Sequence, residues 1–215
     1  MRSSIRPFIA VVVATITLTS CSAPSQTYAS SKSEGVYFAV PNGWHAVLNK
    51  DLNAFESKST ATGAAEKLAL VKWQVAYSPD SKIGSKEVFA FSVIDAPLAF
   101  ARVRSLFPGE VNAVSYNTLR DLVVPLTDWV NNPTKTTPKF SIIDDYEVVE
   151  KGARGVRTIY SFTQDGQAQT VDQTAMVSND RQTMYVFVIR CSDVCYKKNK
   201  KTMTAISDSF TVRGR

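Results

Sequence analysis

Three cysteines and one histidine are the residues of this 215-residue chain best suited to covalent or metal chemistry. Three residues separate Cys191 from Cys195, Cys21 follows an apolar stretch, and His45 adjoins Trp44. A structural zinc site takes about four Cys or His ligands, and a hydrolase triad needs a histidine that a carboxylate orients. Both kinds of site would have very few residues to draw on, so the cysteines are the main candidates for chemistry.

Cys191 and Cys195 are the one pair capable of redox work. Outside the cytosol, two cysteines this close oxidise to a disulfide, and a bridge across this short loop contributes about 2 kcal/mol in the chain-entropy model. A thioredoxin-type enzyme would carry Cys-x-x-Cys, one residue shorter, at a helix N-terminus after a parallel strand. We therefore expect a structural bridge, and a catalytic disulfide is the alternative.

The other candidates for chemistry favour structural roles. His45 could act as a base or a metal ligand, but catalysis would need a carboxylate and a nucleophile that the sequence does not place beside it. Asp144, Asp145, Glu147 and Glu150 form an acidic run without the glycine-punctuated alternation of a calcium loop. No Gly-x-Ser-x-Gly, phosphate loop or dinucleotide fingerprint occurs. We expect no enzyme activity, no cofactor and no metal.

The N-terminal residues have the pattern of an export signal. Two arginines and then the apolar residues 7–18 form a basic region and a stretch of signal-peptide length. The stretch ends in Leu18-Thr19-Ser20-Cys21, which is similar to a bacterial lipobox, where a cysteine is acylated at sulfur and becomes the new N-terminus. We expect residues 1–20 to be removed and lipidated Cys21 to anchor the chain to the extracytoplasmic face of the cell membrane. A free exported cysteine is the alternative.

Charge constrains the partners. Removal of residues 1–20 takes away Arg2 and Arg6 from 25 basic residues and none of the 19 acidic ones, which leaves a formal charge of +4. Much of the excess lies near the C-terminus, in Lys197, Lys198, Lys200, Lys201, Arg213 and Arg215. This cluster could meet anionic lipid headgroups or an acidic partner, and a solvated surface is the simpler interpretation. Nucleic acid is not expected, because basic and aromatic residues do not interleave.

One folded domain behind a linker accounts for the rest of the chain. Residues 21–34 are rich in small polar residues and have no apolar period, which predicts a flexible tether. Residues 35–215 are enough for one hydrophobic core and are expected to form a single domain. No later stretch approaches the about 20 apolar residues of a membrane-spanning helix.

Hydrophobic periodicity predicts strands and helices throughout this domain. Strands are expected over residues 36–40, 44–48, 69–77, 87–94, 156–162, 171–177 and 183–189, and helices over 51–67, 115–130 and beyond 195. The segment 87–94 is apolar on both faces, which favours a strand inside a covered sheet. Pro125 should kink or divide its helix. Asp165-Gly166 and Asn179-Asp180 are turn signals between antiparallel strands. Strand runs with helices on both faces indicate an α+β sandwich.

Two short segments resemble a known family. Pro41-Asn42-Gly43-Trp44, after a strand, is similar to the opening of PsbP-like domains, and a helix running into Ser207-Asp208-Ser209-Phe210 is similar to their closing element. With the lipobox, the chain resembles the actinobacterial LpqN-type lipoproteins. The resemblance implies a three-layer α/β/α sandwich with a central, mainly antiparallel sheet, and the role of an extrinsic binding protein. It implies no catalytic residue.

The binding surface is expected in a loop. Residues 98–112 look like an insertion, and within them 98–107 mix apolar side chains with two arginines. Phe100, Arg102, Arg104 and Phe107 are therefore candidate partner contacts. We expect a lipid-anchored, extracytoplasmic module that binds an envelope protein or helps to assemble an envelope complex. The alternative is a carrier that holds a small apolar or lipid-like ligand in a cleft between sheet and helices.

Overall fold

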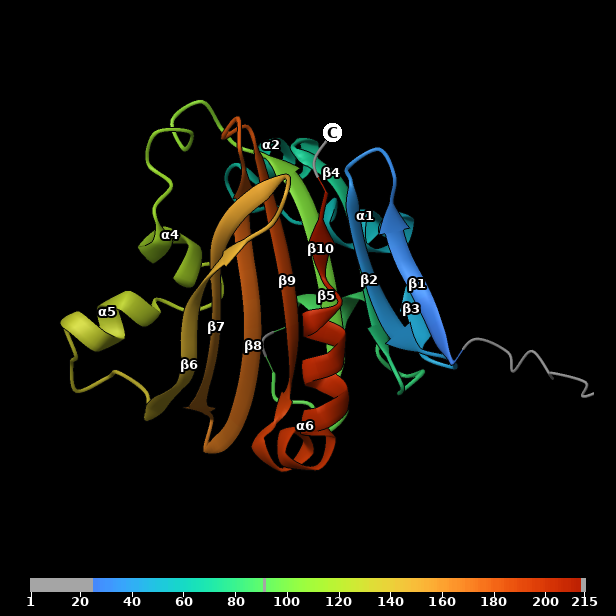
Figure 1. Cartoon of the computed structure of the whole chain (residues 1–215). Helices are drawn as coiled ribbons and strands as arrows, with labels where there is room; N and C mark the ends of the chain where they lie inside the picture. Colours follow the sequence, from blue (N-terminus) through green and yellow to red (C-terminus); the bar gives the residue numbers. More distant parts are fainter. Residues whose placement is uncertain (1–24, 91, 214–215) are drawn as a thin grey trace, which may run out of the picture.

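Antiparallel strands dominate the structure, a computed structural model that describes residues 25–90 and 92–213 (Figure 1). The strands are β1 (Gln26–Ser31), β2 (Val36–Pro41), β3 (His45–Val47), β4 (Val71–Ser78), β5 (Leu98–Ser105), β6 (Phe140–Val149), β7 (Ala153–Gln164), β8 (Gln167–Ser178), β9 (Thr183–Ser192) and β10 (Thr211–Val212). The helices are α1 (Asn49–Glu56), α2 (Ala64–Ala69), α3 (Ser85–Phe89), α4 (Tyr116–Arg120), α5 (Leu126–Asn131) and α6 (Asp193–Asp208). In the described part of the chain, no helix has the length and apolar character to cross a bilayer.

A seven-stranded antiparallel sheet, in the order β3-β4-β5-β9-β8-β7-β6, forms the middle layer. Asp165 and Gly166 adopt φ values of 50° and 78° at the β7–β8 turn, the left-handed conformation that a two-residue hairpin needs. Gly155 of β7 has no room for a side chain, because an added Cβ would lie 1.9 Å from the carbonyl oxygen of Ala175. The turn and this close approach fix the long β7–β8 hairpin.

One face of the large sheet is covered by α6 and by a three-stranded sheet in the order β1-β2-β10 (Figure 1). Their common core contains Phe38 of β2, Phe187 of β9, Met203 of α6 and Phe210, each at most 5% exposed. The Phe187 ring centre lies 5.2 Å from that of Phe38 and 5.1 Å from that of Phe210. Aromatic rings from β2 and from the connection between α6 and β10 therefore meet over the large sheet.

Helices α1 to α5 cover the opposite face in two groups. Leu52 of α1 and Val88 of α3 pack over β4 and the start of β5. Leu119 of α4 and Leu126 of α5 pack over β7 and β8. The expected α+β class, with a central antiparallel sheet between two layers, is confirmed. One outer layer differs from the expectation, because a small sheet shares it with α6.

Part of the segment expected as a tether is a strand. Residues 26–31, expected in the flexible linker 21–34, form β1, which pairs with β2 along its whole length. Ala29 and Ser31 are buried, so small side chains serve packing here rather than flexibility. The linker prediction is wrong for this part because pairing with β2, the next strand along the chain, determines the structure. The proposed lipidation residue Cys21 lies outside the described residues.

Two segments have structures opposite to those expected. Residues 98–107, expected as an inserted loop, contain β5, which lies between β4 and β9. Residues 87–94, expected as an inner strand, contain most of α3 instead. Glu87 Oε2 accepts a hydrogen bond from the Gly84 backbone N–H at 2.9 Å and so caps the start of α3. With β5 inside the sheet, the apolar side chains after Gly84 cover the sheet rather than join it.

The expected break at Pro125 is confirmed, because the proline separates α4 from α5. The helix predicted over 51–67 is two short helices, α1 and α2. The last three predicted strands are β7, β8 and β9, and they are antiparallel neighbours as expected.

A disulfide between Cys191 and Cys195 joins the end of β9 to the first turn of α6. The two Cα atoms are 5.9 Å apart, and both residues are buried. Between them, Ser192 Oγ accepts a hydrogen bond from the Cys195 backbone N–H at 3.2 Å, which caps the helix. The bridge and the cap together fix the direction in which α6 leaves the sheet.

Replacing Cys191 and Cys195 with alanine should lower the free energy of unfolding by about 2 kcal/mol, because the unfolded chain regains the entropy that the small loop removes. Urea denaturation measures the change. Reductant should destabilise the native protein by a similar amount and leave the double alanine variant unaffected. Equal stabilities of the oxidised native protein and the variant would contradict a structural bridge.

Candidate binding groove

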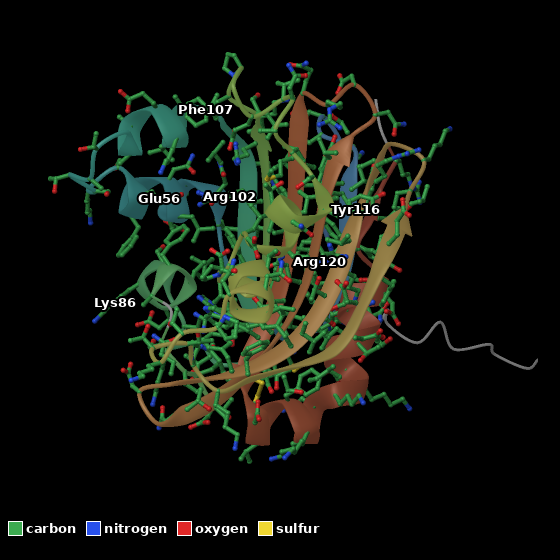
Figure 2. The ribbon with its side chains drawn as sticks, turned by 90° about the vertical axis from the view of Figure 1, so that its left-hand side faces the viewer. Glu56, Lys86, Arg102, Phe107, Tyr116 and Arg120 are labelled. Atoms are coloured by element: carbon green, nitrogen blue, oxygen red, sulfur yellow. A yellow bond between two sulfur atoms is a disulfide. The ribbon has the colours of Figure 1, made fainter. Side chains whose placement is uncertain are left out.

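A groove of about 370 Å³ crosses the face of the large sheet opposite α6. Its floor is made by side chains of the adjacent strands β5 and β9. Phe89 of α3 lines one side, and Leu122, between α4 and α5, lines the other. The groove thus lies between the two groups of helices that cover this face (Figure 2).

The register of β5 and β9 explains the floor. Phe100 lies opposite Val188, Arg102 opposite Val186, and Arg104 opposite Met184. Directly opposed residues share a face of the sheet, so all six side chains point into the groove. The intervening residues of β5, Ala99, Ala101 and Val103, are completely buried in the core beneath α6. β5 therefore carries long side chains on the groove face and small ones on the other.

Arg102 lies in the middle of the floor and is held by several groups. Its Nη2 donates to Glu56 Oε2 and to Gln74 Oε1, both at 2.6 Å. The guanidinium carbon is 5.3 Å from the ring centres of both Phe89 and Phe100, a cation–π distance. Figure 2 shows Glu56 and Arg102 side by side where α1 meets the sheet. The Glu56 carboxylate thus balances the charge of Arg102 within the protein.

The other two arginines of the groove are also held in place. Arg104 forms a bidentate ion pair with Glu110, with N–O distances of 2.7 and 2.8 Å. Arg190 is 2% exposed and donates at 2.8 Å to three backbone carbonyl oxygens, those of Glu87, Ala90 and Ser92. Burial lowers the pKa of Arg190 to about 10, so the side chain stays protonated at neutral pH. Arg190 thereby fastens the end of α3 beside the groove.

The surface that this groove presents to a ligand is mainly apolar. Besides the arginines, its lining consists of aliphatic, aromatic and methionine side chains, without an acid, a base or a nucleophile. Across residues 25–90 and 92–213, no group of three or more His, Cys, Asp or Glu side chains could hold a metal ion. An apolar groove with a few fixed polar groups is a typical small-molecule site.

Three of the four candidate contacts from the sequence come together in the groove. Phe100, Arg102 and Arg104 line it, whereas Phe107 does not. The Phe107 backbone N–H donates to Glu110 Oε2 at 2.8 Å in the turn after β5. The expectation that these residues form a loop surface is wrong, because β5 is an inner strand. Sequence reasoning missed the contribution of β9, since its unbroken apolar run indicates only burial.

The acidic run at residues 144–150 begins within β6 and connects that strand to α4. Asp145 forms an ion pair with Arg120 at 2.8 Å, and Glu147 accepts a hydrogen bond from the hydroxyl of Tyr116. Arg120 and Tyr116 lie on the side of the groove away from Glu56 (Figure 2). These contacts fix the position of α4 beside the sheet.

The chain matches no protein-family model, and no match was found among curated proteins. Similar solved structures include cyanobacterial PsbP (CyanoP) of Synechocystis sp. PCC 6803, with a TM-score of 0.48 and 14% identity over 91% of this chain and 97% of that one. They also include LpqN of Mycobacterium tuberculosis, described as involved in cell envelope biogenesis. Its TM-score is 0.44, with 13% identity over 82% of each chain. A protein of unknown function from Pseudomonas aeruginosa, PA94, matches with a TM-score of 0.36 and 9% identity over 84% of this chain and 92% of that one.

The Arg104–Glu110 pair predicts a pH-dependent stability. Hydrogen bonds from Arg104 hold the pKa of Glu110 below its usual range. A carboxyl with a lower pKa in the folded state stabilises the protein above its unfolded pKa, and this contribution is lost as the pH falls through the folded pKa. Glu110→Gln should therefore cost about 0.5 kcal/mol at neutral pH, as expected of a partly exposed pair. The cost should vanish as the pH falls below about 4.

Urea denaturation of both proteins at several pH values measures this difference. Glu66→Gln is the matched control, because Glu66 is exposed and makes no ion pair in the described part of the chain. A cost at Glu110 that is the same at every pH would contradict the ion pair.

Proposed function

We propose that the chain is a lipid-anchored, non-catalytic binding protein of the bacterial cell envelope, which holds an apolar, chain-like ligand in the groove over β5 and β9. The observation that carries the proposal is an apolar groove whose arginines are already held by other groups of the protein. Its volume of about 370 Å³ falls within the range of roughly 300–1,000 Å³ typical of ligand pockets.

The pairing of the arginines favours an apolar ligand over an anion. An anionic head that bound Arg102 would compete with Glu56, and one that bound Arg104 would compete with Glu110. Displacing a partner from either ion pair would leave a partly buried carboxylate uncompensated, which costs free energy. Apolar side chains such as Val186 and Val188 lose no such partner when a hydrocarbon chain covers them.

The lipobox carries the envelope part of the proposal. Acylation of Cys21 would hold the folded domain at a membrane surface without a spanning helix, since each buried methylene contributes roughly 0.8 kcal/mol. The domain begins to pair at Gln26, directly after the short segment that follows Cys21. An exported, anchored domain with an apolar groove is suited to hold lipid-like molecules outside the cytoplasm.

A protein partner is the second candidate, and the edge strand β6 is the observation that favours it. Ile142, Ile143, Tyr146 and Val149 of β6 are 41–66% exposed. Among the strands of the described residues, β6 pairs with β7 alone, so its other edge can receive a strand from another chain. In this function the chain would help to assemble an envelope complex, through β6 rather than through residues 98–107.

Filling the groove should abolish ligand binding without unfolding the protein. Val186 lies in the middle of the floor, opposite Arg102, so Val186→Trp places an indole where the ligand would lie. We expect the native domain to bind the uncharged fluorescent probe N-phenyl-1-naphthylamine. The variant should bind the probe at least roughly tenfold more weakly, because the probe can no longer bury its apolar surface in the groove.

Val194→Trp is the matched control, because Val194 is 78% exposed on α6, on the other side of the sheet. Native mass spectrometry of the protein from its own host should show a co-purified lipid-like molecule in the native protein and the control variant only. Equal probe binding by all three proteins, and no bound molecule in any, would contradict the ligand proposal.

Metabolic labelling tests the anchor separately. Cells that make the native chain with an alkyne analogue of palmitate should yield a labelled protein in the membrane fraction. Cys21→Ser removes the acylated sulfur, so the label and the membrane association should both disappear. A native protein that stays unlabelled would overturn the anchor and leave the groove proposal to stand on its own data.

A further inference from the structure

The outward face of α6 carries four lysines within five residues. Met203 and Ile206 point to the core, whereas Lys197, Lys198, Lys200 and Lys201 are exposed. At 3.6 residues per turn, these lysines lie around one exposed face of the helix. Val194, one turn earlier on the same face, is 78% exposed. The face therefore joins an exposed apolar side chain to a compact cluster of positive charge.

Little negative charge offsets this cluster. In the described part of the chain, none of the four lysines forms an ion pair or a side-chain hydrogen bond. Asp208, in the last turn of α6, is bound to Arg157 at 2.5 Å. Asp193, in the first turn, accepts a hydrogen bond from the neutral hydroxyl of Thr170 at 2.6 Å, so its carboxylate offsets one of the four lysine charges. The lysine cluster is thus an exposed positive surface.

The chain enters the folded domain in the same layer. β1 belongs to the small sheet that shares one side of the large sheet with α6 (Figure 1). Ala29 faces the core opposite Phe38, so its neighbour Tyr28 points outward, where it is 71% exposed. Because pairing begins at Gln26, the chain from Cys21 to β1 spans at most about 17 Å. A lipid on Cys21 would therefore hold the start of β1, and with it this layer, close to the bilayer.

We propose that the outward face of α6 docks on the anionic lipid surface to which Cys21 is anchored. The lysines contact lipid phosphates, while Val194 and Tyr28 lie at the level of the headgroups, where amphipathic and aromatic side chains are favoured. This inference rests on the lipid anchor of the proposed function. It adds an electrostatic contact that fixes the orientation of the domain, with the groove on the side away from the membrane.

The test uses the acylated full-length protein reconstituted in vesicles. One set is pure phosphatidylcholine, and the other contains one-third phosphatidylglycerol. Acetylation of lysines by a water-soluble reagent, read by mass spectrometry, reports which side chains meet the lipid. Lys58, in the turn after α1, and Lys86, on α3, are exposed on the opposite side of the sheet and serve as internal references. Figure 2 shows Lys86 on α3.

On the anionic vesicles, the four α6 lysines should react roughly fivefold more slowly than on the neutral ones, the factor expected for one lysine at such a surface. High salt should abolish the difference, because it screens the attraction. Lys58 and Lys86 should react equally on both. Equal rates at α6 on the two vesicle types, or protection of Lys58 and Lys86 instead, would overturn the proposal.

A pair of variants separates charge from position. Lys197→Gln with Lys201→Gln should remove the protection of Lys198 and Lys200, and Lys58→Gln with Lys86→Gln, which changes the net charge equally, should preserve it. Flotation distinguishes failure of the anchor from failure of the docking. A protein that floats only with anionic vesicles overturns the anchor and supports the docking, whereas one that floats with neither overturns both.

Discussion

The fold and the groove both depend on the position of β5 between β4 and β9. Ala99 and Ala101 of β5 share the core beneath α6 with large aromatic rings, while Phe100 and Arg102 face the groove. A slip of one residue would move the arginines into that apolar core and expose the alanines. Burying a guanidinium without its partners costs several kcal/mol, roughly the whole stability of a domain, so the register is strongly specified. The same constraint that fixes the sheet therefore also builds the floor of the groove.

Elements with a strong local signal were predictable from the sequence. The hairpin at Asp165-Gly166 and the break at Pro125 follow from backbone chemistry that needs no distant partner. The linker prediction for residues 26–31 failed because their strand depends on hydrogen bonds with β2. Small polar side chains do not indicate that pairing. The strand prediction for residues 87–94 failed because an apolar run fits both an inner strand and a short helix that covers the sheet. The position beside β4 in the sheet is occupied by β5, and the sequence around residues 87–94 does not show this.

Three residues of the groove were predictable from the sequence, but their setting was not. Phe100, Arg102 and Arg104 alternate with small residues, which is the spacing of one strand face, but two arginines in ten residues also suit an exposed loop. What turns them into a groove floor is distant in sequence, since Glu56 is 46 residues from Arg102 and Gln74 is 28 residues from it. Local patterns do not encode such pairs, and only the fold brings the partners together.

The two faces of the large sheet are suited to different neighbours. The layer of α6 and β1 carries the exposed lysines and the N-terminal end of the described chain, whereas the groove lies on the opposite face. With the α6 layer on the lipid, the groove would face the aqueous side, and a hydrocarbon chain could not pass straight into it from the bilayer that anchors the protein. It would have to arrive with another carrier that meets the helices around the groove. The internal ion pairs of Arg102 and Arg104 suit an apolar ligand in this position, because a hydrocarbon chain that covers the floor removes water from it, and each arginine then keeps a carboxylate partner within the protein.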